Sequence, residues 1–188
     1  MADFALTAAP ILGGVDKSIG NCHLRERDDL ALVSVATPLG GEAELKAKLS
    51  SGWSLETPEP TMSVASGDTR AIRTSADQLM LVFPHSAPDA VAAVSAKIGD
   101  AGYLTDQTDV WVVLELSGVD ARSALERLCP LDLHPDAFAV NASGRTVMEH
   151  MGALIVRTGE DTYLLMSASS SAGSFLHAVE TSCEWIAE

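Results

Sequence analysis

Residues 72–82 read IRTSADQLMLV, and residues 156–166, which lie 84 positions further along the chain, read VRTGEDTYLLM. Four of the eleven positions are identical, and the apolar residues fall at nearly the same places. Each copy consists of two short apolar runs joined by a polar turn, which is the pattern of a β-hairpin. A hairpin that recurs at this distance predicts a chain built from two similar halves.

The elements around the two hairpins are predicted in the same order. The strands are expected at residues 30–37, 69–74, 78–83, 109–116, 145–149, 153–158 and 162–167, and the helices at 42–49, after Ser86, after Ser117 and from the serine run 167–171 onward. Ser86 and Ser117 each stand three positions before an aspartate, which predicts two capping boxes. In each half, the predicted order is one strand, one helix, two strands and one helix. This is the order of a split β-α-β unit. We therefore predict an α+β fold of two ferredoxin-like halves, with helices on one face of each sheet.

The domain organisation follows from this pattern. Residues 1–27 show no sustained period of 2 or 3.6 residues, so they predict an extended N-terminal arm. Residues 28–188 predict a single α+β domain made of two repeated halves, 28–100 and 101–188. Within the first half, Pro58 and Pro60 predict a loop over residues 50–66.

The charge balance excludes two classes of partner. The chain holds 12 Lys and Arg against 26 Asp and Glu, a net charge of -14, and no basic stripe. Nucleic acids and anionic membrane surfaces are bound through clustered basic residues, so neither is an expected partner. Three distant cysteines and an acidic N-terminus suggest neither a disulfide framework nor a secretory signal. We expect a cytoplasmic protein.

No motif assembles an active site. The five histidines and three cysteines lack the close ligand pairs of zinc sites, and neither a G-x-S-x-G elbow nor a phosphate-binding glycine motif occurs. Cys183 lies at helical spacing from Val179 and Ile186, which is typical of a small core residue. A catalytic pair of Cys129 and His134 stays open, although a loop cysteine before a proline is the simpler interpretation.

The most distinctive segment is residues 129–138, CPLDLHPDAF. Its two prolines hold the backbone extended, and its apolar residues stand in a segment too irregular for a core element. Two interpretations remain: an ordered Ω-type loop closed by its own side chains, and a docking surface for another chain. The candidate interface residues are Cys129, Leu131, Asp132, Leu133, His134 and Phe138.

This string, placed after a predicted helix and before the strand at Arg145, resembles the hallmark of the gamma subunit family of heterotetrameric sarcosine oxidase. The resemblance covers roughly residues 30–185 and is strongest over 111–166. It implies a small non-catalytic subunit of an enzyme that oxidatively demethylates sarcosine to glycine and transfers the one-carbon unit to tetrahydrofolate.

The resemblance also implies partners and cofactors. The chain would pack chiefly on the alpha subunit, within a complex that also holds beta and delta subunits. FAD, FMN, NAD, tetrahydrofolate and zinc would lie on those other subunits, and no cofactor, catalytic residue or metal is expected on this chain. Its fold would be similar to the folate-binding part of aminomethyltransferases. The alternative is a self-standing folate-binding module or aminomethyltransferase-like enzyme, although no folate-binding acidic motif is found.

Overall fold

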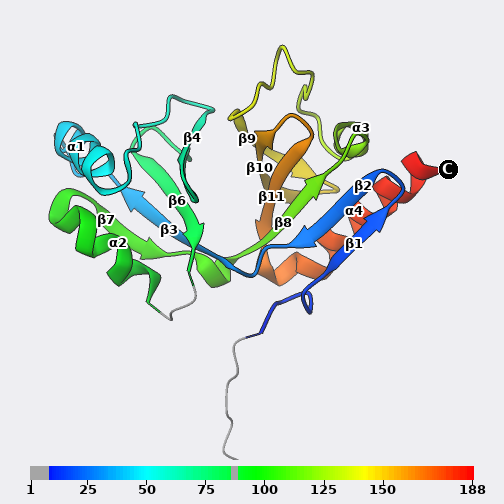
Figure 1. Ribbon diagram of the computed structural model, residues 1–188, viewed down its shortest axis with the longest axis horizontal. Coiled ribbons are helices and arrows are strands. Elements are labelled where there is room, and N and C mark those ends of the chain that lie inside the picture. Colours follow the sequence, from blue (N-terminus) through cyan, green and yellow to red (C-terminus); the bar gives the residue numbers. More distant parts are fainter. Residues whose placement is uncertain (1–8, 86–88) are drawn as a thin grey trace, which may run out of the picture.

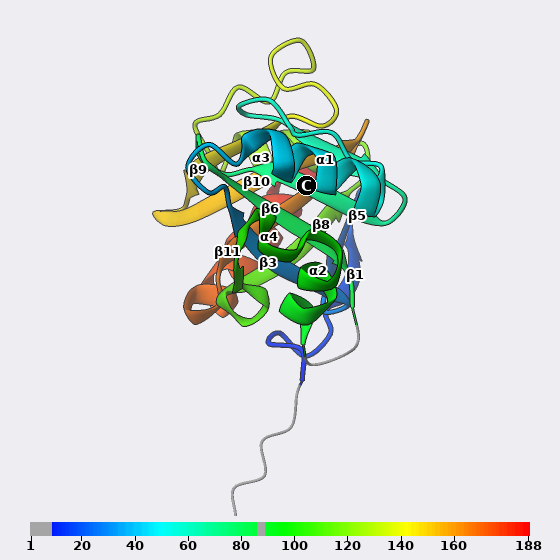
Figure 2. The same ribbon diagram turned by 90° about the vertical axis from the view of Figure 1, so that its left-hand side faces the viewer.

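The structure is a computed structural model, which describes residues 9–85 and 89–188. Two antiparallel sheets pack against each other through one face each, and helices cover their outer faces (Figure 1). Figure 2, seen from the side of the N-terminal half, shows α1 and α2 lying in front of one sheet. The coarse α+β prediction is therefore confirmed.

The N-terminal sheet has five strands. Its order is β4 (Ser63–Ser66), β5 (Thr69–Arg73), β6 (Gln78–Pro84), β3 (Leu30–Ala36) and β7 (Tyr103–Asp106). Helices α1 (Glu42–Trp53) and α2 (Ala90–Ile98) cover it, and their buried Leu45, Leu49 and Val94 share one apolar cluster with the sheet. Because β6 and β7 each pair antiparallel with β3, they run parallel on its two sides. This is the split β-α-β arrangement expected from the sequence.

The C-terminal sheet has six strands. Its order is β1 (Asp16–Ile19), β2 (Cys22–Glu26), β8 (Trp111–Ser117), β11 (Thr162–Ala168), β10 (Met151–Gly159) and β9 (Ser143–Met148). Helices α3 (Ala121–Glu126) and α4 (Ala172–Ala187) pack on its outer face. Short 3₁₀ turns lie at Gly99–Ala101, Thr108–Val110 and Ser169–Ser171.

Between the sheets lies a third apolar cluster. It takes side chains from both inner faces, among them Leu32 and Met80 from the first sheet and Leu154 and Met166 from the second. These strands are buried on both faces, which explains why they read as continuous apolar runs rather than as alternating ones.

The two halves meet through reciprocal hydrogen bonds. The Ser63 amide donates to the Asn141 carbonyl at 2.7 Å, and the Ser143 amide donates to the Thr61 carbonyl at 2.8 Å. Each half therefore donates one backbone hydrogen bond to the other and accepts one from it. The two donors lie 80 positions apart in the chain, as do the two acceptors, close to the 84 positions that separate the repeated hairpins.

The N-terminal arm is the first correction. Residues 1–8 lie outside the described part of the chain, but Asp16–Ile19 and Cys22–Glu26 form a hairpin, not an arm, and β2 pairs with β8. In the C-terminal sheet, β2 lies next to β8. In the N-terminal sheet, β7 occupies the equivalent position next to β3. The second half therefore receives its last strand from the start of the chain. The predicted division at residues 100 and 101 also cuts β7 from the sheet that it completes.

The buried Glu26 fixes the chain just before this hairpin. Its carboxylate accepts from the backbone amides of Leu12 at 2.9 Å and Gly14 at 2.8 Å. Glu26 is only 4% exposed, and this pair of charge-assisted hydrogen bonds compensates its burial. Residues 12–14, which the sequence predicted to be part of an extended arm, are thus tied to the second sheet.

Smaller predictions also need correction. The loop expected over residues 50–66 holds the end of α1 and all of β4. One predicted cap, Ser86, lies outside the described residues, and the helix there is capped by Asp89, whose side chain accepts from the Ala92 amide. Ser117 caps nothing; it is the last residue of β8, and Gly118 follows it. A Cβ at Gly118 would stand 1.9 Å from the Asn21 carbonyl oxygen, so only glycine fits between hairpin and helix.

No helix among the described residues is long and apolar enough to span a membrane.

Candidate interface

The loop from Cys129 to Phe138 connects α3 to β9 and is ordered by its own backbone. The His134 amide donates to the Asp132 carboxylate at 2.9 Å, which is an Asx turn. The amides of Ala137 and Phe138 then donate to the His134 carbonyl at 2.9 and 2.8 Å. Two tight turns thus fold the segment on itself, as in the Ω-loop interpretation of the sequence.

The apolar side chains of this loop point into the protein. Leu133 is 0%, Phe138 6% and Cys129 8% exposed, and Leu131 packs against the same core cluster. A Cβ on Gly144 of β9 would lie 2.9 Å from a Leu131 methyl carbon, so the loop closes tightly over this strand. Cys129, Leu133 and Phe138 are therefore core residues, and Leu131 is partly buried against them. The docking surface expected from Leu131, Leu133 and Phe138 is not formed, because burying them in the core is what orders the loop.

A buried arginine holds the loop in place. Arg157 of β10 is 5% exposed, and its Nη1 donates to the Phe138 carbonyl at 2.9 Å. Its Nε donates to the carbonyl of Glu160 at 3.1 Å, at the turn between β10 and β11. One guanidinium thus links the end of the loop to the repeated hairpin. The internal repeat of the sequence aligns Arg157 with Arg73, but nothing in it indicated that Arg157 would hold the loop.

The structure does not bring Cys129 and His134 together as a catalytic pair. The Cys129 thiol donates to the Leu125 carbonyl at 3.5 Å, whereas the His134 Nδ1 accepts from the Asp136 amide at 3.3 Å. Burial raises the pKa of the Cys129 thiol above its ordinary value. The thiol therefore stays protonated at neutral pH, and this is unfavourable for a nucleophile.

The other two cysteines are likewise buried. Cys22 of β2 and Cys183 of α4 are 2% and 1% exposed, and burial raises the pKa of Cys183 to about 12. The core position expected for Cys183 is confirmed. Among the described residues, no three His, Cys, Asp or Glu side chains gather as a metal site.

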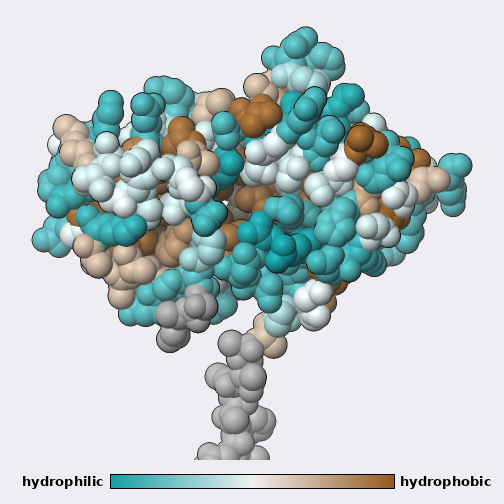
Figure 3. Space-filling model, in the orientation of Figure 1, coloured by the Kyte–Doolittle hydropathy of each residue, from teal (hydrophilic) through white to brown (hydrophobic). Residues whose placement is uncertain are grey.

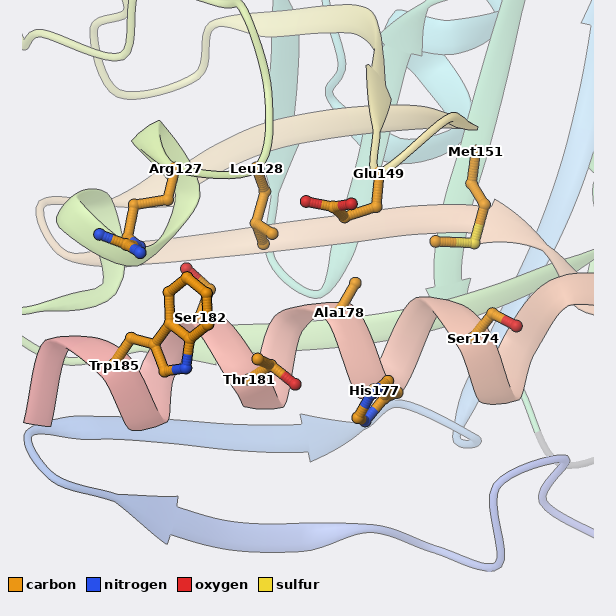
Figure 4. A pocket seen from close by; sticks show the side chains of 10 residues that line it. All are labelled: Arg127, Leu128, Glu149, Met151, Ser174, His177, Ala178, Thr181, Ser182 and Trp185. Atoms are coloured by element: carbon orange, nitrogen blue, oxygen red, sulfur yellow. The ribbon is translucent and has the colours of Figure 1, made fainter.

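A groove with a volume of about 600 Å³ lies between α4 and the segments that follow α3 and lead into β10 (Figure 4). Its apolar lining comes from Leu128 after α3, Met151 of β10 and Ala178 of α4. At one end, the Arg127 guanidinium lies 4.8 Å from the centre of the Trp185 ring, a cation–π contact. Trp185 is 60% exposed although it is among the largest apolar side chains of the chain.

The turn at the rim of this groove is strained. Glu149 and His150 join β9 to β10 with positive φ angles of 46° and 73°. Two-residue hairpin turns of this hand favour Asn and Gly, because other side chains clash in the left-handed region. Strain of this kind is found mostly where a residue serves a function, and Glu149 itself lines the groove.

The exposed polar residues of the loop and the groove belong to the same half of the molecule. Asp132 and His134 are exposed on the loop that follows α3, and Arg127 lies just before that loop. On the face shown in Figure 3, hydrophilic residues divide the hydrophobic surface into small patches. The sequence pointed to the loop but missed the groove, because the residues of the groove come from three separate segments.

Comparisons with known proteins agree on one family. The model of the family described as "Sarcosine oxidase, gamma subunit family" matches residues 41–184. A sarcosine oxidase subunit gamma from Arthrobacter sp. is 32% identical over 126 residues, which cover 67% of this chain and 61% of that protein. One from Corynebacterium sp. (strain P-1) is 31% identical over 160 residues, covering 84% of this chain and 78% of the relative.

Solved structures share the fold. A chain of the heterotetrameric sarcosine oxidase from Corynebacterium sp. U-96 superposes with a TM-score of 0.77 at 24% identity, over 92% of this chain and 88% of that one. The aminomethyltransferase T of the glycine cleavage system from Bartonella henselae superposes with a TM-score of 0.64 at 16% identity. That match covers 85% of this chain but 45% of the aminomethyltransferase.

Proposed function

The chain belongs to the sarcosine oxidase gamma subunit family, and on this premise we propose that it is a non-catalytic subunit of a heterotetrameric sarcosine oxidase. The enzyme would oxidatively demethylate sarcosine to glycine and pass the one-carbon unit to tetrahydrofolate. The observation that carries the proposal is the family match over residues 41–184. The complex would be cytoplasmic.

The chemistry of the described residues supports a role without catalysis. Cys129, which the sequence offered as a nucleophile together with His134, is buried, and burial raises the pKa of its thiol. As the family resemblance implies, we further propose that FAD, FMN, NAD, tetrahydrofolate and zinc lie on the alpha, beta and delta subunits, and none on this chain.

We assign the contact with the large alpha subunit to the outer side of the C-terminal half. Exposed tryptophan and arginine side chains are the residue types that most often anchor protein interfaces, and Arg127 and Trp185 stand together at the end of a groove. The exposed Asp132 and His134 of the neighbouring loop would extend this surface as a polar rim. The loop contributes its polar residues, since its apolar ones are in the core.

A self-standing folate-binding module is the less favoured alternative. The fold is shared with aminomethyltransferase T, and the two similar halves are consistent with that relationship. However, the match leaves more than half of the aminomethyltransferase without a counterpart in this chain, since it covers 45% of that protein.

The proposal is tested by mild affinity purification of the tagged chain from its native host grown on sarcosine. The expected result is a yellow complex with flavin absorbance and three further subunits, identified by mass. A colourless chain that elutes alone, from a host with sarcosine oxidase activity, would contradict it. Titration of that isolated chain with tetrahydrofolate would then test the alternative.

The interface assignment has its own test. Replacing Trp185 with Ala is expected to reduce recovery of the large subunit in this purification by about tenfold, which is the effect of losing one interface anchor. Trp53→Ala is the matched control, because Trp53 lies on α1 of the other half with Lys97 stacked over its ring at 4.3 Å. Equal losses from both variants would remove the groove from the interface.

A further inference from the structure

Four residues form a row across the inner face of the C-terminal sheet, and the two in the middle are an alanine and a glycine. Trp111 of β8 pairs with Ala168 of β11, and Gly152 of β10 pairs with Val147 of β9. Ala153 pairs with Ser167, so Gly152 lies beside Ala168 and the four residues form one row. Strands are spaced about 4.8 Å apart, so Trp111 and Val147 stand roughly 14 Å apart with only a glycine and an alanine between them.

This gap is open space. A Cβ added at Gly152 would meet no atom within 4 Å, although the next residues on the same face, Leu154 and Met166, belong to the buried core between the sheets. A cavity of about 480 Å³ lies here, lined by Trp111, Gly152, Ala168 and Arg145 among others. Cavities that hold small molecules commonly measure about 300 to 1,000 Å³.

The cavity holds one buried donor without an acceptor in the described part of the chain and one exposed cation at its rim. The indole Nε1 of Trp111 is buried and makes no hydrogen bond. Arg145, at the next position of β9 on the same face, is exposed at the rim of the cavity. It enters none of the ion pairs found among the described residues, so its guanidinium is free to bind an anion there. Buried donors are almost always paired in folded proteins, so the indole N–H indicates a missing acceptor.

The charged side chain that lines the cavity favours an anion. The chain carries 26 Asp and Glu, yet no acidic residue lines this cavity, and Arg145 is its one charged side chain. Two of its serine hydroxyls bond to the backbone: Ser167 donates to the Gly152 carbonyl at 2.9 Å and Ser171 to the Ala168 carbonyl at 3.0 Å. Neither hydroxyl accepts a hydrogen bond from Trp111 or Arg145, so the buried indole N–H is left for an acceptor that the described residues do not supply.

We propose that this cavity binds a small organic carboxylate. The carboxylate group accepts from the Trp111 Nε1 and from the Arg145 guanidinium, a charge-assisted contact, while the apolar body of the ligand lies over Gly152 and Ala168. The apolar lining excludes a bare inorganic anion as the preferred ligand, because such an ion leaves that surface in contact with water. This inference does not depend on the assignment of the chain to an oxidase complex.

The test uses the full chain labelled with ¹⁵N and benzoate as the probe. Benzoate is expected to move the Trp111 indole N–H resonance in a saturable way, and the indole resonances of Trp53 and Trp185 are expected to stay in place. Trp111→Phe assigns the resonance. Benzyl alcohol, which lacks the charge, and inorganic phosphate, which lacks the apolar body, are expected to produce no saturable shift.

Arg145→Gln is expected to weaken benzoate binding by about tenfold, as removal of one charged partner commonly does. Arg25→Gln is the matched control, because Arg25 is an exposed arginine on β2 outside this cavity. Three results would each overturn the proposal: no saturable shift with benzoate, an equal response to benzyl alcohol or phosphate, or equal weakening by both arginine variants.

Discussion

The two halves of the molecule share one plan and differ in how they complete it. The N-terminal half closes its sheet with its own last strand, β7, whereas the C-terminal half ends at α4 and takes β2 from the other end of the chain. The C-terminal half also carries the ten-residue loop over β9, the groove at Trp185 and the cavity at Trp111. The two halves thus share a framework, but only the C-terminal half carries these added features, and we call it the elaborated half.

Equivalent positions make this comparison measurable, since a residue of one half serves as the control for its counterpart in the other. Arg73 and Arg157 occupy the same place in the repeated hairpin, and each donates to the carbonyl three residues further on. Only Arg157 is buried and reaches a loop as well.

The largest effect is expected from Arg157→Met. This change leaves the carbonyls of Phe138, Gly159 and Glu160 without their donor, and we expect the free energy of unfolding to fall by about 3 kcal/mol. Arg73→Met, which removes one exposed hydrogen bond to Ala76, should cost less than about 1 kcal/mol. Urea denaturation followed by circular dichroism measures both. Similar losses in the two variants would mean that the loop is not anchored by Arg157.

The next effect concerns the loop itself. Leu133→Ala should lower the free energy of unfolding by about 2 to 4 kcal/mol, because it leaves a cavity at a side chain that is 0% exposed. His134→Ala, one residue away and exposed, should change it by less than about 0.5 kcal/mol. If the loop were a free docking segment, both variants would unfold at the same urea concentration as the unaltered chain.

A third comparison sets the two outer strands against each other. Glu26 ends β2 and accepts two backbone amides while buried, so Glu26→Ala should cost about 2 kcal/mol. Asp106 ends β7, is exposed and accepts one amide, that of Thr108 at 2.9 Å. Asp106→Ala should cost less than about 1 kcal/mol. Thermal unfolding of both variants ranks them, and a larger loss at Asp106 would contradict the account of the borrowed strand.

The smallest effect is a change in acid stability. The hydrogen bond from Arg27 holds the pKa of Asp29 below its ordinary value of 3.8. Because the folded-state pKa is the lower one, the stabilisation is present above this ordinary value and is lost as the pH falls through the folded-state pKa. Asp29→Asn should therefore lower the urea midpoint slightly at neutral pH, and this difference from the unaltered chain should shrink in strong acid. A constant difference at every pH would exclude the ion pair as its cause.

Local patterns predicted much of the fold. The two hairpins, β5–β6 and β10–β11, and the strands β3 and β8 lie within a few residues of their expected bounds. The β1–β2 hairpin was missed because its strands are short and polar on one side, and its partner β8 is far away in sequence. Periodicity records the local environment of a segment and contains no information on which distant strand it joins.

The candidate site was predicted less well, for a related reason. The segment 129–138 was correctly predicted to be irregular, and an ordered Ω-type loop was one of its two interpretations. The direction of its apolar side chains depends on β9 and Arg157. The pairing of Arg127 with Trp185, and of Trp111 with Arg145 in one cavity, joins segments that share no sequence motif. Such juxtapositions arise only from tertiary packing.

The central claim is that the elaborated C-terminal half binds the partner subunits. Hydrogen exchange of the chain alone, compared with the chain in the purified complex, tests it most directly. The account predicts added protection in α4, in the 129–138 loop and at the β9–β10 turn, with α1 and α2 unchanged. Protection confined to α1 and α2 would contradict it.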